Sequence, residues 1–212
     1  MFDNRKGLAH TPNVPDLLSS QPSSDSGYPA RTDENHEFCL NGHRLDVSGR
    51  SASYDHSVHL STSSCDLCWE LHLPRWTWLV IDHRRLQHEA PASHAELVLA
   101  ARPPEVKAGV GQIELRLRGQ VIADIDVRLC GVDTRGVIEQ VRVDEKYQRR
   151  GFGTVLVAAA LARGPAYRWS TTKLDDSVGA RAFWASLRPA GPLQLGEPFY
   201  CSHMRLADGD RI

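Results

Sequence analysis

The sequence has 212 residues, of which 41% are hydrophobic and 24% charged, enough for one ordinary domain with or without a small appendage. Its 25 basic and 26 acidic residues give a net charge of −1, which excludes a global basic field for nucleic acid and an acidic tail. No apolar run approaches the roughly 18 residues of a membrane span. Residues 1–10 lack the apolar stretch of a signal peptide, so we expect a cytoplasmic protein without a membrane partner.

The first part of the chain is poor in the residues that build a core. Residues 1–35 are rich in Ser, Pro, Asp and Asn and show no regular hydrophobic period, which predicts a disordered arm. Residues 36–75 are rich in His and Cys but poor in aliphatic side chains. We therefore expect something other than hydrophobic packing to hold the second segment together.

Four Cys and His residues in that segment have the spacing of metal ligands. Cys39-x-x-x-His43 and Cys65-x-x-Cys68 form two hooks separated by 21 residues. Zn²⁺ prefers four tetrahedral nitrogen and sulfur ligands, and a site with all four positions filled is structural. We therefore predict a structural Zn²⁺ module over residues 36–75. A redox pair of Cys65 and Cys68, or free thiols, is the alternative. Other histidines could replace the fourth ligand: His36, His56, His59 and His72.

The next elements in chain order are strands. Residues 76–81 form an aromatic and β-branched run typical of a strand, and residues 95–101 fit a short strand or a helix. Residues 112–118 and 121–129 alternate between apolar and polar positions around Gly119-Gln120, which predicts an antiparallel hairpin. Residues 137–143 are predicted to be a further strand.

The last third of the sequence alternates helices with strands. Residues 154–163 predict a deeply buried helix closed by Gly164-Pro165, and residues 167–174 a strand. A second helix is expected from a cap at Asp176 or Ser177 to about Leu187, and a final strand over residues 199–206. This order predicts a mixed α/β domain over residues 76–212, with a mostly antiparallel sheet flanked by helices.

A glycine-containing loop connects the strand at 137–143 to the buried helix. It reads Gln148-Arg149-Arg150-Gly151-Phe152-Gly153-Thr154. Glycines allow the backbone to approach a bulky anion, and the N–H groups of a helix N-terminus favour phosphate. The loop therefore indicates a phosphate site, with a simple tight strand-to-helix turn as the alternative.

The loop and its surroundings carry a family resemblance. Residues 137–153, a strand ending in Val-Asp followed by Tyr147 and then Gln-Arg-Arg-Gly-Phe-Gly, resemble motif A of the GNAT acetyltransferase superfamily. The helix at 177–187 looks like the motif that follows in that family. The resemblance covers about residues 110–206.

The resemblance implies an N-acetyltransferase in which a primary amine of a small molecule or protein attacks acetyl-CoA directly. Val141 and Val143 would pair with the pantetheine arm, and Glu139 would act as base for the amine. An ordinary solvated carboxylate is the alternative for Glu139. The pyrophosphate would bind to the loop residues Gln148, Arg149, Arg150, Gly151, Phe152, Gly153 and Thr154.

Two positions depart from the family pattern. Trp184 stands where a Tyr often protonates the leaving thiolate, and Ser177 stands where Asn is usual. The candidate proton donors are Tyr147, Tyr200, Cys201 and His203. Cys130 and Cys201 are expected to be buried small hydrophobic side chains, and His203 a packed or surface histidine.

The departures keep a second function open, namely a catalytically degenerate GNAT fold that senses CoA or binds protein or nucleic acid through its zinc ribbon. The acceptor wall that precedes the hairpin in the family is not visible before Gln112. A small-molecule amine, a protein amine and an aminoacyl-tRNA all remain candidate acceptors. The neutral charge disfavours nucleic acid, but Arg84-Arg85 and Arg149-Arg150 leave it open. Acyl-chain preference and homo-oligomerisation are also open.

Overall fold

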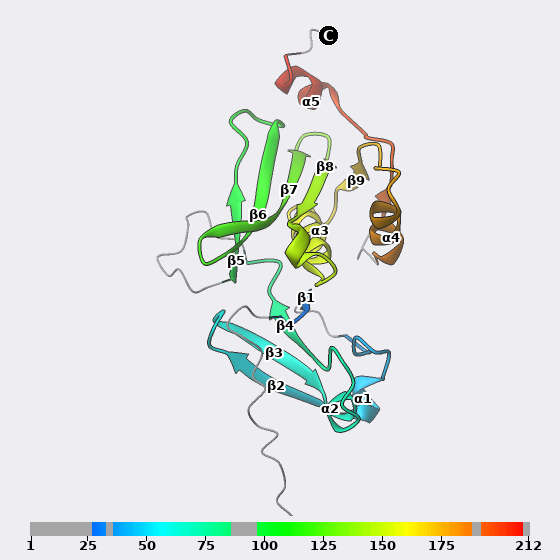
Figure 1. Cartoon of the computed structure of the whole chain (residues 1–212). Helices are drawn as coiled ribbons and strands as arrows, with labels where there is room; N and C mark the ends of the chain where they lie inside the picture. The colour runs from blue at the N-terminus through cyan, green and yellow to red at the C-terminus, as the bar shows by residue number, and fades with distance from the viewer. Residues whose placement is uncertain (1–26, 33–35, 86–96, 188–191, 210–212) are drawn as a thin grey trace, which may run out of the picture.

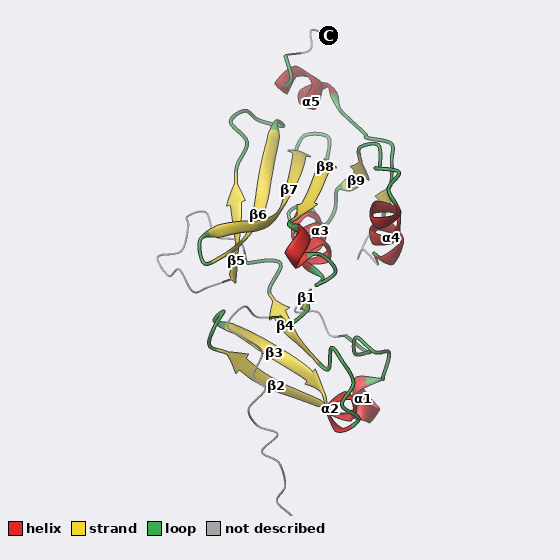
Figure 2. Ribbon diagram, viewed as in Figure 1, coloured by secondary structure: helices red, strands yellow, loops and turns green. Residues whose placement is uncertain are grey.

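The computed structural model describes residues 27–32, 36–85, 97–187 and 192–209, which form two sheets, one below the other in Figures 1 and 2. The arrangement of helices and strands is mixed α/β, as predicted. None of the helices in these ranges has the length and apolar character needed to cross a membrane.

The smaller sheet has four strands in the order β1-β4-β3-β2. β1 (Ala30–Thr32) runs parallel to β4 (Thr77–Ile81), and β3 (Leu60–Cys65) pairs antiparallel with β4 and with β2 (Arg50–Asp55). β4 confirms the strand predicted at residues 76–81. The sheet therefore joins strands from both sides of the segment predicted to be a zinc module, and the domain boundaries at residues 35 and 75 stay predictions.

β1 lies in the segment for which we expected a disordered arm. Ala30 and Thr32 are buried, the N–H of Leu79 donates to the carbonyl of Pro29 (2.8 Å), and that of Ala30 donates to the carbonyl of Arg150. These contacts order residues 30–32, which the sequence pattern did not reveal because three residues are too few to show a period. Residues 1–26 and 33–35 of the predicted arm lie outside the described residues.

The larger sheet has six strands in the order β10-β9-β8-β7-β6-β5. It is antiparallel from β5 to β8 and parallel from β8 to β10. The predicted hairpin is confirmed, with Leu117 opposite Gln120, and the segment that fitted either a strand or a helix is a strand. The strands are β5 (Leu97–Arg102), β6 (Val110–Leu117), β7 (Gln120–Cys130), β8 (Arg135–Val143), β9 (Arg168–Thr171) and β10 (Leu193–Gln194).

Helices follow the strands of the larger sheet. Both predicted helices are confirmed as α3 (Phe152–Ala162) and α4 (Val178–Ser186), and the Ser177 hydroxyl caps α4 by accepting the N–H of Ala180 (3.2 Å). The remaining helices are short: α1 (Leu45–Ser48), α2 (Asp66–Glu70), the 3₁₀ turn η2 (Glu145–Tyr147) and α5 (Ser202–Ala207).

The strand predicted at residues 199–206 is wrong. This segment is extended up to Cys201 and then forms α5. Cys201 and Met204 are buried while Ser202, His203 and Arg205 are exposed, a spacing of three that belongs to one helical turn. A single turn has too few residues to distinguish a period of 3.6 from a period of 2.

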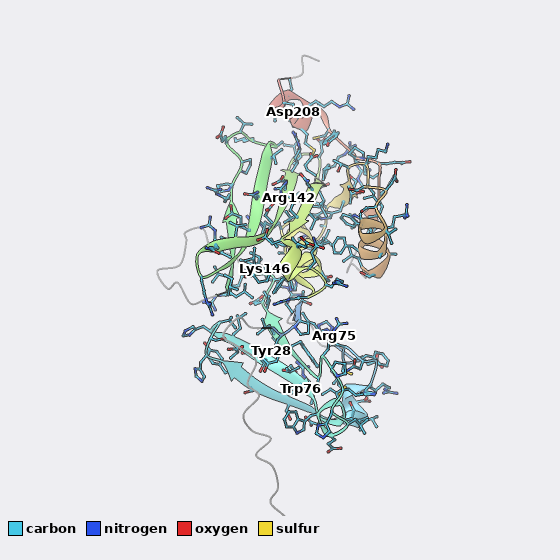
Figure 3. All side chains as sticks on the ribbon, viewed as in Figure 1. Tyr28, Arg75, Trp76, Arg142, Lys146 and Asp208 are labelled. Carbon is cyan, nitrogen blue, oxygen red and sulfur yellow. The ribbon has the colours of Figure 1, made fainter. Side chains whose placement is uncertain are left out.

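One hydrophobic core joins α3 to both sheets. Buried side chains such as Leu156 of α3 and Leu115 and Ile125 of the larger sheet pack with Leu79 of the smaller sheet. Tyr28 packs on the same core where the two sheets meet (Figure 3). This shared core packs the two sheets against α3 and holds β1 against the loop that precedes α3.

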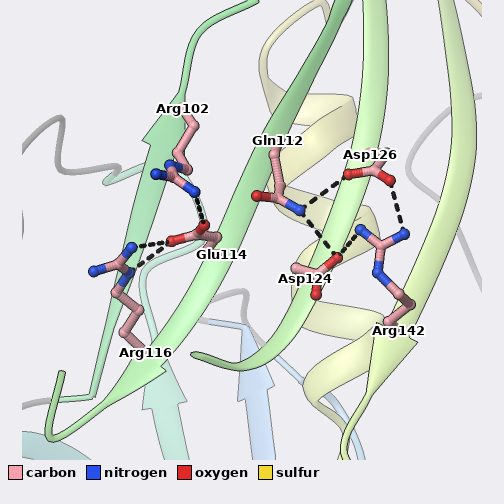
Figure 4. A network of polar contacts seen from close by, with 7 residues as sticks. All are labelled: Arg102, Gln112, Glu114, Arg116, Asp124, Asp126 and Arg142. Atoms are coloured by element: carbon pink, nitrogen blue, oxygen red, sulfur yellow. Dashed lines mark hydrogen bonds and ion pairs between the residues drawn. The ribbon is translucent and has the colours of Figure 1, made fainter. Parts of the chain in front are cut away.

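The other face of the larger sheet is polar. Arg142 pairs with both Asp124 and Asp126, and the Glu114 carboxylate, only 3% exposed, accepts from Arg102 (3.1 Å) and Arg116 (Figure 4). A buried charge of this kind is tolerated because it is paired on both oxygens. The alternation of β6 and β7 therefore separates an apolar face under α3 from a charged face.

Replacing Leu156 with Ala should lower the free energy of unfolding by about 2–5 kcal/mol, because it opens a cavity between α3 and the sheets. Urea denaturation of the full chain followed by circular dichroism measures the loss. The control is Val178→Ala at the exposed start of α4, which should change stability by less than about 0.5 kcal/mol. Equal midpoints for the two variants would contradict this packing.

Candidate functional site

The candidate site lies where β8 separates from β9. The two strands pair only from Arg135↔Arg168 to Ile138↔Thr171, and β8 then continues to Val143. At the same place the register between β7 and β8 shifts, so that Glu139 is an extra residue on β8. A β-bulge bends its strand and re-aims its side chains. The described residues place no ladder partner beside β8 on this side after Thr172, which leaves a free backbone edge.

A cleft of about 870 Å³ opens at this divergence. Its walls are the end of β8, the loop before α3, the end of β9 with the residues that follow it up to 175, and α4. Nine of the ten residues predicted from the sequence line it: Glu139, Val141, Val143, Gln148, Arg149, Gly151, Phe152, Gly153 and Thr154.

Arg150 is the predicted residue that does not line the cleft. Its carbonyl accepts the N–H of Ala30, and its guanidinium carbon lies 5.5 Å from the centre of the Tyr147 ring. The loop therefore uses Arg150 for packing against β1 and η2. A contribution of its charge to an anion in the cleft stays a prediction.

The loop backbone has the conformation expected for an anion site. Arg149 and Gly151 have positive φ angles of 59° and 88°, and alternating conformations of this kind turn successive N–H groups to one side. The N–H groups in the first turn of a helix have no acceptor within the helix. Gly151, the N-cap of α3, has no side chain with which to accept them. These N–H groups can bind the oxygens of a phosphate.

The two glycines also have packing roles. A Cβ atom at Gly151 would lie 2.1 Å from the carbonyl oxygen of Ala30, and one at Gly153 would lie 2.9 Å from the ring of Phe183. Gly151 therefore allows β1 to approach the loop, and Gly153 allows α4 to approach α3. The two interpretations of the loop, a tight turn and a phosphate site, are compatible in this geometry.

Glu139 is tied to the C-terminal part of the chain. Its side chain is 18% exposed and accepts from Arg128 Nε (2.6 Å) on one oxygen and from the Tyr200 hydroxyl (2.8 Å) on the other. Arg128 also donates to the carbonyl of Met204 (3.2 Å) and pairs with Asp208 (2.7 Å). Since a carboxylate oxygen has two lone pairs, each oxygen of Glu139 can accept one further hydrogen bond.

The Tyr200 hydroxyl remains protonated and donates its hydrogen bond to Glu139. Burial, together with the neighbouring Glu139 carboxylate, raises the pKa of Tyr200 to about 12, so its hydroxyl is protonated at every physiological pH. Of the four candidate proton donors, Tyr147 lines the cleft and Tyr200 reaches Glu139. Cys201 and His203 instead gather with Cys130. Trp184, which replaces the usual acid of the resemblance, also lines the cleft.

The four predicted metal ligands come together at the far end of the smaller sheet. Cys65 ends β3, Cys68 lies in α2, and Cys39 and His43 come from the loop before α1. His43 Nδ1 lies 3.1 Å from the Cys68 sulfur and 3.8 Å from that of Cys65, and the Cys39 and Cys68 sulfurs are 3.6 Å apart. Tetrahedral zinc bonds of about 2.3 Å separate two sulfurs by about 3.8 Å, so this cluster could hold a metal ion.

The surroundings of the cluster favour the thiolate at Cys65 but not at Cys68, where burial and the neighbouring Cys65 and Cys39 raise the pKa to about 11. The N–H groups of Asn41 and His43 each donate to the Cys39 sulfur at 3.3 Å. Burial raises the pKa of the Cys65 thiol, but hydrogen bonds with Ser48, Cys68 and His43 outweigh it and lower the pKa to about 6. A metal binds the deprotonated thiol. All five cysteines are free, and no other histidine of the described ranges joins this cluster.

A second group of donor atoms was not predicted as a site. Cys130, Asp133, Cys201 and His203 lie with their donor atoms within 4.8 Å of one another. Cys130 and Cys201 are buried, as expected, but their sulfur atoms also lie close to the polar donor atoms of Asp133 and His203. The available signal was their spacing, because Cys130-x-x-Asp133 and Cys201-x-His203 are two further hooks.

Comparison with known families decides the classification. The model of the acetyltransferase (GNAT) family matches residues 66–187, more than half of the chain. The chain belongs to the GNAT family. The match contains the cleft, the loop and α4, so the GNAT resemblance seen in the sequence is confirmed and an acyltransferase-type function is supported. No curated protein and no solved structure gives a match.

The GNAT match ends at residue 187, before the segment that carries Tyr200. The contact of this segment with Glu139 can be measured by a double-mutant cycle. Tyr200→Phe and Glu139→Gln should each destabilise the chain, and their effects should fall short of additivity by about 1–3 kcal/mol, because both remove one hydrogen bond to a charged group.

Equilibrium unfolding at pH 7 of the wild type, both single variants and the double variant gives the coupling energy. Tyr54→Phe, which removes a half-exposed hydroxyl elsewhere, should show no coupling with Glu139→Gln. Additive effects of the Tyr200 and Glu139 substitutions would show that the two side chains do not interact in solution.

Proposed function

We propose that this GNAT protein is an N-acetyltransferase that transfers the acetyl group of acetyl-CoA to a primary amine of a small molecule or protein. The observation that carries the proposal is the cleft at the divergence of β8 and β9, which joins a free strand edge to a loop with the N–H groups of a helix start. These are the two features that a pantetheine arm and a pyrophosphate require.

The residues of the cleft would divide the binding of acetyl-CoA between them. The N–H groups of residues 151–154 and the charge of Arg149 would bind the pyrophosphate, and the free edge of Val141 and Val143 would pair with the amide groups of pantetheine. Such pairing fixes the thioester along β8. Holding two reactants in place can supply much of the rate enhancement of a direct transfer.

Chemistry at the thioester requires a neutral amine, because a protonated amine has no lone pair. Glu139 would take the proton from the incoming amine, directly or through water, as the N–C bond forms and the C–S bond breaks. The thiolate that leaves needs no strong acid, since a thiol with a pKa of about 8.5 is a good leaving group near neutral pH. Trp184 in place of a tyrosine is therefore compatible with turnover.

We further propose that Cys39, His43, Cys65 and Cys68 hold a structural Zn²⁺. Three of the five buried members of the apolar cluster around them are the cysteines themselves, and Leu45 is the one aliphatic side chain among the five. A metal with four protein ligands replaces hydrophobic packing in such small units and has no open position for catalysis.

One observation favours the rival function, a catalytically degenerate GNAT fold that binds CoA without transferring its acyl group. Both oxygens of Glu139 already accept hydrogen bonds, from Arg128 and Tyr200, so the carboxylate is engaged in holding the C-terminal segment. Binding and turnover must therefore be measured separately.

Thr154→Glu tests the CoA site. Thr154 is exposed in the first turn of α3 and lines the cleft, and an acidic residue in that turn favours the helix while it repels a pyrophosphate. Acetyl-CoA binding by calorimetry should weaken at least about tenfold, or 1.4 kcal/mol, with unchanged thermal stability. Thr154→Gln is the matched neutral control and should bind like wild type.

Release of CoA thiol over a panel of amines then separates the two functions. Turnover with any amine that Glu139→Gln slows supports the transferase. Wild-type binding without turnover supports the rival, and equal acetyl-CoA affinity in Thr154→Glu and wild type would overturn the cleft as the CoA site.

Cys68→Ser and His43→Ala should each remove one zinc ion per chain, as counted by native mass spectrometry, and make residues 36–75 sensitive to protease. The cause is the loss of one of four ligands in a unit with little other packing. His72→Gln, which removes one of the other histidines of this region, should keep the zinc content of the wild type. Unchanged zinc in Cys68→Ser would contradict the assignment.

A further inference from the structure

The second donor cluster lies at the opposite end of the molecule from the first. Cys130 ends β7 and Asp133 lies in the turn to β8, while Cys201 and His203 belong to the start of α5 (Figure 1). The Cys130 sulfur is 3.7 Å from His203 Nδ1 and 3.5 Å from the Asp133 carboxylate, which is 2.8 Å from the same nitrogen. The Cys201 sulfur lies within 4.8 Å of all three.

The geometry is not that of a catalytic Cys-His-Asp triad. In a triad the histidine uses one ring nitrogen for the thiol and the other for the carboxylate. Here a single nitrogen, His203 Nδ1, faces both the Cys130 sulfur and the Asp133 carboxylate. Four donor atoms within 4.8 Å of one another, with only one nitrogen of the ring involved, could instead be the ligands of an ion.

The donor set is one that zinc accepts. Thiolate, imidazole and carboxylate are its usual ligands, and bonds of about 2.3 Å to sulfur and 2.0 Å to nitrogen separate a sulfur from a nitrogen by about 3.5 Å. The distance from the Cys130 sulfur to His203 Nδ1, 3.7 Å, is close to that value, and its distance to the Asp133 oxygen, 3.5 Å, suits a metal bond of about 2.0–2.2 Å to oxygen. The short contact between His203 and Asp133 is a hydrogen bond that an ion between them would replace.

The short helix α5 would gain stability from a metal bond to the rest of the domain. α5 has six residues, too short to be stable by itself. Its apolar anchor is small and consists of five buried side chains, two of them cysteines: Ala108, Cys130, Val137, Cys201 and Met204. A metal would bond the start of α5 to the β7–β8 turn and hold the segment that follows α4.

We propose that Cys130, Asp133, Cys201 and His203 form a second structural zinc site, which fixes the C-terminal segment to the end of β7. The two zinc sites together use all five cysteines of the sequence. The second site also holds Tyr200, the residue before Cys201, in place for its hydrogen bond to Glu139. The site thereby links a metal outside the cleft to a residue that lines it.

The test is zinc stoichiometry of the full chain by native mass spectrometry after dialysis against zinc-free buffer. The wild type should carry two zinc ions, and His203→Ala and Cys201→Ser should each carry one. His203 is 45% exposed, so its replacement should leave the fold intact. His56→Ala removes an exposed imidazole outside both clusters and should keep two ions.

Hydrogen exchange supplies the second measurement. Amides of residues 200–207 should exchange faster in His203→Ala than in wild type, and no faster in His56→Ala. Cys68→Ser, which acts on the first cluster, should lower the zinc count without faster exchange in α5.

Three outcomes would overturn the proposal. The first is one zinc per wild-type chain that His203→Ala retains and Cys68→Ser loses. The second is a wild-type mass lower by two hydrogens, with no zinc at this site, which would assign Cys130 and Cys201 to a disulfide. The third is loss of zinc in His203→Ala with unchanged exchange in α5, which would show a bound ion that holds nothing. None of these results depends on acetyl-CoA binding, so the proposal is tested separately from the transferase function.

Discussion

The separation of β8 from β9 after Ile138 is the constraint on which the site depends. While the two strands pair, the sheet is closed; after the bulge at Glu139 one backbone edge is left open beside a helix start. Backbone groups on an unpaired strand edge have no ladder partner, so other contacts must keep the strand in place. β8 stays paired with β7 on its other side as far as Val143, and α3 covers the apolar face of the sheet. These contacts keep β8 in place where its second edge is unpaired.

The two donor clusters lie at opposite ends of the molecule, away from its main hydrophobic core. Each donor cluster lies where a short helix meets the end of a strand, α2 with β3 in one case and α5 with β7 in the other. Both helices have fewer than seven residues and few buried apolar side chains. The middle of the molecule, where α3 packs between the two sheets, has a large hydrophobic core instead. Ligand clusters therefore occur where the hydrophobic core ends.

The sequence predicted those features whose signal repeats over many residues. The hairpin of β6 and β7 shows eight or more alternating positions, α3 is apolar over three turns, and the glycine loop has fixed order. Features set by contacts between distant segments were missed. β1 has three residues, α5 has one buried turn, and the donors Cys130 and Cys201 are 71 positions apart, so only the fold brings them together. The contact of the Arg150 carbonyl with β1 was missed for the same reason, because the N–H of Ala30 that donates to it comes from a distant part of the sequence.

Glu139 links the cleft to the C-terminal segment, and this link limits what a single residue can do. As a bulge residue it lines the cleft, and through Arg128 and Tyr200 it also anchors the chain around Met204 and Asp208. A carboxylate with two donors is held in one orientation, which favours positioned proton transfer, but the same donors occupy a lone pair on each of its oxygens. The balance between a fixed orientation and an oxygen open to the amine therefore depends on how firmly the C-terminal segment holds Tyr200. A segment fixed by a metal would keep that hydroxyl in one place, and a loose one would free an oxygen of Glu139 for the amine.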